Sequence, residues 1–203
     1  MMKIIVTTSD NYHHILPTFF KLWKMNWGGE IELVGYNEPE NLPDYCKFVS
    51  MGVQRGPEYF SDDLAAYFAT QPKWFIWLME DTFIKKVDRF ELLHMEGLCH
   101  DNVGRIALTT DILKRDHTVY GVGDHSIAFA HPHTQYRLST QPSIWNRDFL
   151  LQYLTPGLSP WAFEKQETVD GWKIYGPVKN AVYHNEGVRK NDIFNLNLDG
   201  IEI

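Results

Sequence analysis

Hydrophobic and polar positions alternate between a strand pattern and a helix pattern in the first half of the chain. Lys3 to Thr8 (KIIVTT) is a β-branched run followed by the polar residues SDN, which predicts a buried first strand. Leu16, Phe20, Trp23 and Trp27 are spaced by four, three and four residues, as on one face of an amphipathic helix. The pattern therefore predicts a strand followed by a helix.

Three more strands and a second helix are predicted before residue 80. Residues 30–35 (EIELVG) and 46–50 (CKFVS) have strand composition, and a helix is expected to start with Ser61 as its N-cap. Residues 73–79 (KWFIWLM) show no alternation of apolar and polar positions. Such a run is typical of the central strand of a parallel sheet that is covered on both faces.

The second half of the chain is predicted to be mixed. We expect helices over residues 87–100, after Asn146 and after Ser159-Pro160, where good capping residues precede apolar runs. Residues 103–138 are rich in β-formers, Gly and His, and their strand order does not follow from the pattern. Together the two halves predict an α/β fold, a mainly parallel sheet flanked by helices.

Length and composition favour a single domain over residues 1–203, since 203 residues suffice for one sizeable core. The longest apolar run, Trp74 to Met79, is far shorter than the roughly 20 residues of a membrane-spanning helix. The first residues lack the apolar region of a secretory signal, and the two cysteines cannot form a disulfide framework. These features lead us to expect a cytoplasmic protein.

Charge argues against a protein that binds nucleic acid through its phosphates. The net charge is -7, and the basic residues are scattered rather than gathered in a stripe.

The histidine pairs His13-His14 and His131-x-His133 have no further ligands at a recognised zinc spacing, so we interpret them as structural. Residues 121–126 (GVGDHS) are expected to form a turn.

Candidate chemistry lies after two of the predicted strands. Ligands of such sheets bind beyond the carboxyl ends of the strands, which puts Thr7 and Ser9 on the same rim as Glu80 and Asp81. Two adjacent carboxylates at a buried strand end are electrostatically unfavourable unless a positive group is near. A divalent cation that bridges a diphosphate would supply this charge. Alternatively the acids simply begin a loop, with one capping the turn and the other facing water.

Four stretches of the chain, in order, carry a resemblance to a known family. They are KIIVTTSDNY, SDDLAAYFATQPKWFIWLMEDTFI, YRLSTQPSIWNRDFLLQYLTPGLSPWAFE and YHNEGVRKND. With these stretches the sequence resembles a small nucleotide-sugar glycosyltransferase of the GT-A fold, similar to glycosyltransferase family 2. The resemblance implies a GT-A-like three-layer α/β/α sandwich, with a nucleotide-binding half at about residues 1–85 and an acceptor-side half at about residues 86–203.

The same resemblance assigns residues to a nucleoside diphosphate sugar of the UDP or TDP type. Asp81 and His184 would hold Mn²⁺ or Mg²⁺ at the diphosphate, although Thr82 stands where a second aspartate often lies in the acidic motif. Thr7 and Ser9 could instead be ordinary turn residues. Arg55 could be a solvated loop charge, and Asp62 could be only an acid that stabilises the N-terminus of its helix. The donor-binding set is Thr7, Ser9, Arg55, Asp62, Glu80, Asp81, Arg189 and Lys190.

The resemblance further implies a catalytic base and an acceptor side. Glu164 would take the proton of the acceptor hydroxyl in an inverting transfer. The acceptor-side residues would be Gln141, Ser143, Trp145 and Trp161. Trp145 could instead be a core residue, and Glu164 could be only a first-turn helix acid.

Three classes of function remain open from the sequence. The first is a sugar transferase, with a glycan acceptor favoured over a hydroxylated base in DNA because the protein is acidic. The second is a binding module of the same fold that recognises nucleotide-sugar or glycan without catalysis. The third, a metal-dependent hydrolase or nucleotidyltransferase, has no second acidic motif to support it.

Overall fold

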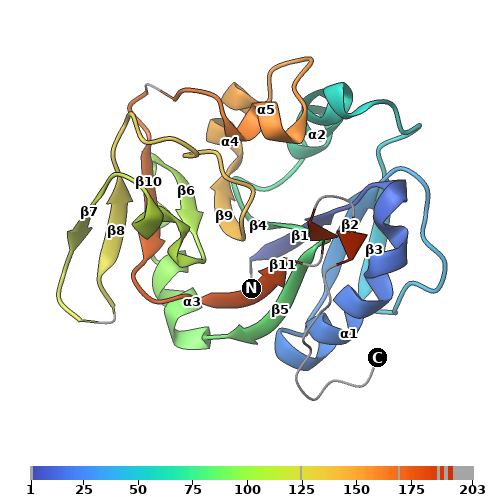
Figure 1. Ribbon diagram of the computed structural model, residues 1–203, viewed down its shortest axis with the longest axis horizontal. Coiled ribbons are helices and arrows are strands. Elements are labelled where there is room, and N and C mark those ends of the chain that lie inside the picture. The colour runs from blue at the N-terminus through green and yellow to red at the C-terminus, as the bar shows by residue number, and fades with distance from the viewer. Residues whose placement is uncertain (1, 124, 169, 187, 190–191, 194–203) are drawn as a thin grey trace.

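One large sheet forms the centre of the protein (Figure 1). The computed structural model describes residues 2–123, 125–168, 170–186, 188–189 and 192–193. Nine described strands follow one another across the sheet in an order that leaves β4 near its middle. From one edge to the other they are β3 (Cys46–Ser50), β2 (Ile31–Gly35), β1 (Lys3–Thr7), β4 (Trp74–Met79), β9 (Ser143–Asn146), β6 (Val103–Ala107), β10 (Lys173–Pro177), β8 (Ile127–Ala130) and β7 (His117–Tyr120).

The sheet is mainly parallel. Strands β3, β2, β1 and β4 pair in parallel, and so do β6 and β10. Strand β9 pairs antiparallel with both β4 and β6, and β8 pairs antiparallel with β10 and β7. Among the described strands of the main sheet, only β9 and β8 therefore run against the common direction. The neighbouring parallel strands β1 and β4 thus have their carboxyl ends on the same side of the sheet.

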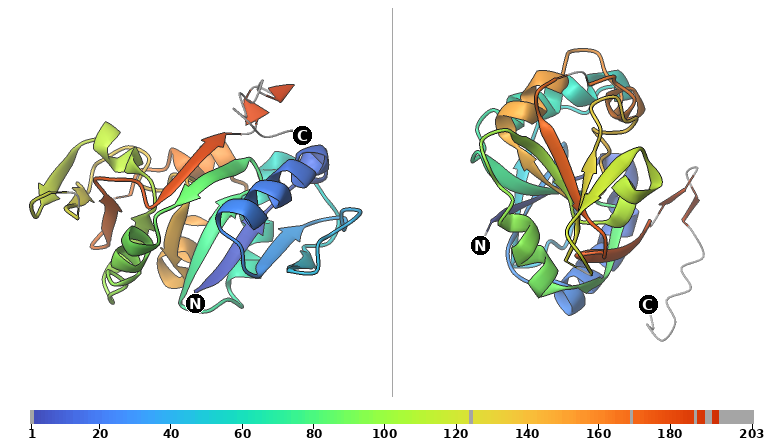
Figure 2. Two further views of the ribbon diagram at one scale, coloured as in Figure 1. Left: turned by 90° about the horizontal axis from the view of Figure 1, so that it is seen from below. Right: turned by 90° about the vertical axis from the view of Figure 1, so that its left-hand side faces the viewer.

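Helices cover both faces of this sheet, which gives three layers (Figure 2). The helices are α1 (Leu16–Asn26), α2 (Phe60–Phe68), α3 (Arg89–Glu96), α4 (Arg147–Tyr153) and α5 (Pro160–Glu164), with 3₁₀ turns η1 (Asp10–Ile15), η2 (Pro57–Tyr59) and η3 (Thr110–Lys114). One apolar core joins the sheet to α1 and α3, and a second core joins its other face to α2, α4 and α5. The predicted three-layer α/β/α sandwich is confirmed.

Two small ribbons complete the described fold. Strand β5 (Thr82–Val87) continues directly from the turn after β4 and pairs antiparallel with β11 (Val182–Glu186). Phe83 and Ile84 of β5 pack into the same core as α1. The second ribbon pairs β12 (Val188–Arg189) with β13 (Asp192–Ile193). The pairing of β5 with β11 brings a late segment of the chain next to the acidic residues that follow β4.

The first half of the chain confirms the elements expected from its pattern. β1, α1, β2, β3 and β4 lie where apolar spacing placed them, and four consecutive residues of β4 are buried, as a doubly covered strand requires. Asn146 and Ser159 cap α4 and α5 with their side chains. The helix expected over residues 87–100 is shorter, because β5 runs to Val87 and the Asp88 carboxylate caps α3.

The expected N-cap role of Ser61 is wrong. Helix α2 starts at Phe60, directly after the 3₁₀ turn η2, and Ser61 is fully buried inside it. Its hydroxyl donates to the carbonyl of Thr155 at 2.5 Å and accepts from the amide of Leu158 at 3.0 Å. Ser61 therefore binds a distant loop instead of its own helix terminus.

No helix among the described residues is long and apolar enough to cross a membrane.

Candidate active site

A cleft of about 690 Å³ opens at the carboxyl ends of β1 and β4. Residues that follow these two strands form one wall, and residues of α2, α5 and the segment before β9 form the opposite wall. The cleft brings together nine of the residues singled out from the sequence: Thr7, Ser9, Arg55, Glu80, Asp81, Gln141, Trp161, Glu164 and His184.

Glu80 is the most deeply buried acid of the cleft, and only 3% of the residue is exposed to solvent. Its backbone amide donates to the carbonyl of Thr7 at 3.1 Å, which holds the ends of β4 and β1 together. Burial, and then the charge of Asp81, raises the pKa of Glu80 to about 8, against the opposing backbone hydrogen bonds to its carboxylate. Its Oε2 atom has no hydrogen-bond partner among the described residues. Glu80 therefore binds a proton at neutral pH unless a cation approaches.

Asp81 follows Glu80 at the turn that leads from β4 into β5. The backbone carbonyl of Asp81 accepts from the amide of Phe83 at 3.1 Å. Asp81 is half-buried and lines the cleft. His184 of β11 reaches the same cleft, because the pairing of β11 with β5 sets it opposite Ile84. The carboxylate of a turn and the imidazole of a strand thus border the same cleft.

The cleft carries a negative field. Burial, followed by the charges of Glu80 and Asp81, raises the pKa of the Tyr12 hydroxyl. Arg55 is the one Lys or Arg among the described residues that line the cleft. Its guanidinium makes an ion pair with Asp63 and lies 3.9 Å from the centre of the Tyr59 ring. A diphosphate in this cleft would therefore need additional positive charge.

Glu164 lies at the end of α5 on the opposite wall. Its Oε1 atom accepts from both the amide and the hydroxyl of Thr140, at 2.6 and 2.7 Å. These two bonds fix the carboxylate against the segment before β9. Trp161 of the same helix is 64% exposed and borders the cleft. The wall thus offers a fixed carboxylate beside an exposed aromatic face.

Helix α2 holds the loop that leads into α5. The amide of Gly157 donates to Asp62 at 2.8 Å, next to the bonds between Ser61 and the same loop. Asp62, expected to bind the donor, does not line the cleft; its carboxylate instead accepts from the amide of Gly157 in the loop before α5. The position of α5, with Trp161 and Glu164, therefore depends on α2.

Two residues expected on the acceptor side lie in the core. Ser143 and Trp145 belong to β9 and are fully buried. The Ser143 hydroxyl accepts from Arg105 at 2.9 Å, and the Trp145 ring stacks on Phe149. The acceptor-side expectation is wrong for this pair because β9 lies between β4 and β6, where both its faces are covered. Lys190 and the side chain of Arg189 lie outside the described residues.

Several residues of the cleft were not found from the sequence. Tyr12, Gln54 and Thr140 all line it, and Gln54 accepts from the amide of Asp10 at 2.8 Å. Tyr12 follows the first predicted strand by only a few residues. The rule that ligands bind beyond the carboxyl ends of parallel strands could therefore have included it. Thr140 gave no signal, since it becomes relevant only through its contact with Glu164.

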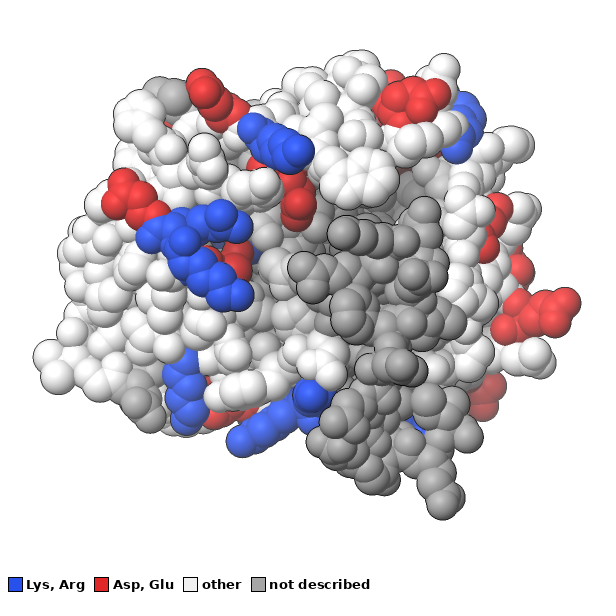
Figure 3. Space-filling model, in the orientation of Figure 1, with Lys and Arg blue, Asp and Glu red and all other residues white. Residues whose placement is uncertain are grey.

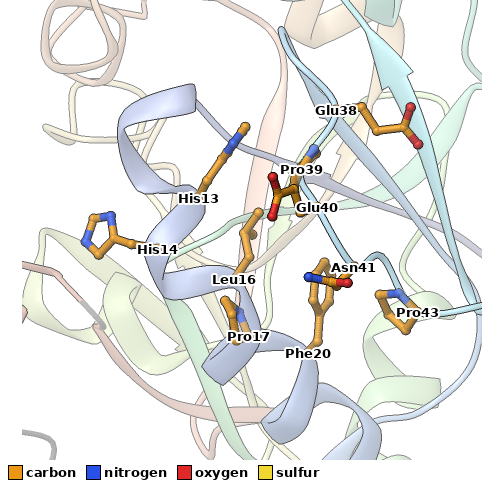
Figure 4. Close-up of a pocket in the computed structure, with 10 residues that line it drawn as sticks. All are labelled: His13, His14, Leu16, Pro17, Phe20, Glu38, Pro39, Glu40, Asn41 and Pro43. Atoms are coloured by element: carbon orange, nitrogen blue, oxygen red, sulfur yellow. The ribbon is translucent and has the colours of Figure 1, made fainter.

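A second cavity, of about 850 Å³, lies elsewhere (Figure 4). Leu16, Pro17 and Phe20 border it from the side of α1, and Asn41 and Pro43 from the loop between β2 and β3. None of the residues assigned from the sequence to donor binding, acceptor binding, catalysis or metal binding lines it. The chemistry of the smaller cleft makes it the better candidate for the active site.

Comparisons with known proteins give only distant likenesses. No protein-family model matches the chain, and no curated protein matches it. Among solved structures, the chain is similar to galactosyltransferase LgtC in complex with donor and acceptor sugar analogues, with 14% identity, a TM-score of 0.43 and coverage of 74% of this chain and 60% of that one.

Two further solved structures have a similarly low sequence identity to this chain. HddC from Yersinia pseudotuberculosis is 10% identical, with a TM-score of 0.47 and coverage of 90% of this chain and 92% of that one. Mannosyltransferase PcManGT from Pyrobaculum calidifontis, in complex with GDP-Man and Mn²⁺, is 12% identical, with a TM-score of 0.35 and coverage of 52% and 34%. All three TM-scores are below 0.5, so the likeness does not extend to the activity of this chain.

Proposed function

We propose that this protein is a glycosyltransferase of the GT-A type that moves a sugar from a nucleoside diphosphate sugar to an acceptor hydroxyl. The observation that carries the proposal is the cleft itself, in which an acidic wall faces a wall with a fixed carboxylate and an exposed tryptophan. The first wall suits a diphosphate with its cation, and the second suits a sugar acceptor and a base.

The acidic wall supports a divalent cation at the diphosphate. The carboxylate of Asp81 repels an anion, buried Glu80 offers no positive charge, and Arg55 is engaged with Asp63. Mn²⁺ or Mg²⁺, which prefer oxygen ligands, would neutralise both the protein carboxylates and the diphosphate. Asp81 would hold the cation, with His184 beside it. The unpartnered Oε2 atom of buried Glu80 fits such a site, because an adjacent cation compensates its charge.

The opposite wall supports Glu164 as the general base of an inverting transfer. Thr140 holds Oε1 of Glu164, while Oε2 accepts no hydrogen bond among the described residues. That oxygen can accept the proton of an acceptor hydroxyl. Trp161 offers a flat apolar surface on which a sugar ring can stack. An inverting transfer needs its base on the face of the donor sugar opposite the leaving diphosphate, and this is the position proposed for Glu164.

The acceptor is proposed to be a glycan rather than DNA, and the donor a UDP- or TDP-sugar. On the face seen in Figure 3, basic side chains form small groups separated by acidic and neutral ones. Together with the net charge of -7, this gives no continuous surface for a phosphate backbone.

The test combines binding and turnover. A panel of UDP- and TDP-sugars with Mn²⁺ is expected to raise the melting temperature of the wild type by mass action. With the sugar that binds, Glu164→Gln should lower kcat of transfer by about 10²- to 10⁴-fold and leave donor binding unchanged, because only the proton acceptor is lost. Glu167→Gln, a change at an exposed acid of the same region, should keep wild-type kcat.

Two outcomes would contradict the proposal. A wild type whose melting temperature responds to no nucleotide-sugar would exclude the donor site. Donor binding without transfer to any glycan acceptor would instead indicate the binding module of the same fold.

A further inference from the structure

Helix α3 carries an acid and a histidine on one face, away from the cleft. Glu91 and His94 are three residues apart, so their side chains are neighbours on the helix surface. The Glu91 side chain is only 2% exposed and that of His94 is partly exposed. A Glu-x-x-His pair on a helix is also the arrangement with which helical metal proteins present two ligands to one ion.

These two side chains face each other without a hydrogen bond. Oε1 of Glu91 and Nδ1 of His94 are 3.4 Å apart, and each is buried with no hydrogen-bond partner among the described residues. A buried carboxylate that lacks full compensation costs free energy. The pair therefore points at a common space that suits a cation.

His125 adds a third ligand from the turn between β7 and β8. Its Nδ1 atom is 3.1 Å from Oε2 of Glu91, and its side chain is 58% exposed. The ring of Phe90 packs against the His125 ring, with 4.9 Å between their centroids. One ligand atom from each of Glu91, His94 and His125 lies within 4.8 Å of the others.

We propose that Glu91, His94 and His125 form a zinc site that ties the turn between β7 and β8 to α3. Tetrahedral zinc with bonds of about 2.0–2.1 Å separates its ligand atoms by about 3.4 Å. Each imidazole lies near that spacing from one carboxylate oxygen of Glu91, with His94 Nδ1 3.4 Å from Oε1 and His125 Nδ1 3.1 Å from Oε2. Two imidazoles and one carboxylate are a ligand set that zinc accepts, with the fourth position open to water on the exposed side of His125. Mn²⁺ and Mg²⁺ prefer sites made of oxygen ligands.

This site is separate from the proposed donor site. None of its three residues lines the cleft. In Figure 1, α3 lies below the sheet and the two helices that border the cleft, α2 and α5, lie above it. The expected role is structural, because zinc would bridge two segments more than thirty residues apart and so oppose their separation on unfolding.

The experiment measures zinc binding to tag-free protein from which metals have been removed with a chelator. Isothermal titration with ZnCl₂ should show one site per wild-type chain, and the melting temperature should rise with zinc concentration. His125→Ala, at an exposed position, should fold and bind zinc at least about 100-fold more weakly, since even outer-shell partners of a metal ligand contribute 10- to 100-fold. Glu91→Gln should weaken zinc equally.

Matched variants separate this site from other histidines and from the cleft. His133→Ala, at another exposed histidine, and Asp81→Asn, in the cleft, should both keep the zinc affinity of the wild type. Co²⁺ bound in place of zinc should give the visible absorption of tetrahedral coordination, and His125→Ala should abolish it. A wild type that binds no zinc, a His125→Ala variant with wild-type affinity, or a loss seen only in Asp81→Asn would overturn the proposal.

Discussion

Two adjacent carboxylates in the cleft have different surroundings and therefore different expected roles. Glu80 directly follows the buried strand β4 and has a pKa raised to about 8, chiefly because it is removed from water. Asp81, one residue later, is half-buried and lies at the turn where the chain leaves the sheet. A cation bound as proposed would therefore meet Asp81 first, with Glu80 behind it in the interior.

The first prediction compares the two acids. Asp81→Asn should weaken Mn²⁺ binding by more than about 100-fold, because a direct ligand contributes more than the 10- to 100-fold typical of outer-shell groups. Glu80→Gln should weaken it by about tenfold, since glutamine keeps the shape of the side chain and one acceptor oxygen. Titration of each variant with Mn²⁺, followed by electron paramagnetic resonance of the free ion, measures both. Equal losses in the two variants would make Glu80 a ligand as well.

The tryptophans show where prediction from sequence stops at the scale of single residues. Trp145 and Trp161 both follow a polar stretch and both fitted the acceptor side of the expected site. In the structure Trp145 is fully buried and Trp161 is 64% exposed. The difference arises from β9, which inserts between β4 and β6, and its pairing with β4 joins residues more than sixty positions apart in the chain. Local patterns contain no information on such a partner.

At the scale of elements, the position of α5 depends on hydrogen bonds from α2. The hydroxyl of fully buried Ser61 connects both the carbonyl of Thr155 and the amide of Leu158 to the helix. Asp62 adds the amide of Gly157. These bonds fix the loop immediately before Trp161 and Glu164, so this contact positions the wall of the cleft that carries both residues.

The second prediction tests this contact. Ser61→Ala should lower the free energy of unfolding by about 1–3 kcal/mol, because a buried carbonyl and amide lose their partner. Ala66→Ser, on the exposed side of the same helix, should change it by only about 0.5 kcal/mol through helix propensity. Urea denaturation followed by tryptophan fluorescence measures both variants. A loss in Ser61→Ala no larger than that of the control would show that the loop is held without this hydroxyl.

Elements with a strong period were predictable, and those that depend on a distant partner were not. The apolar spacing of α1 and the unbroken apolar run of β4 each need only neighbouring residues to be recognised. Strand β5 was missed because its second half, with Lys85 and Lys86, is exposed and polar. It is a strand because β11, about a hundred residues later, pairs with it.

Across the whole molecule, two buried arginines connect the segments of the second half. Arg105 of β6 donates to Ser143 of β9 and to Asp111 in η3. Arg137, before β9, donates to the carbonyls of Thr168 and Trp172 at 2.6 and 2.5 Å. Both side chains are at most 1% exposed. Since neither charge reaches water, these bonds must replace its hydration.

The last prediction concerns Arg137, which holds the loop before β9 to the segment before β10. Arg137→Met should lower the free energy of unfolding by about 3–5 kcal/mol, because partly buried Asp170 loses its cation and the carbonyls of Pro132, Thr168 and Trp172 lose a donor. Arg137→Lys should recover only a small part of this loss, since one ammonium cannot reach acceptors that the planar guanidinium contacts from separate nitrogens. Arg115→Met, at an exposed arginine over the Tyr136 ring, should cost about 1 kcal/mol or less. Urea denaturation of the three variants measures these differences. An Arg137→Lys variant as stable as the wild type would show that this position supplies only a positive charge. The separate hydrogen bonds of the guanidinium would then not be what holds the two segments together.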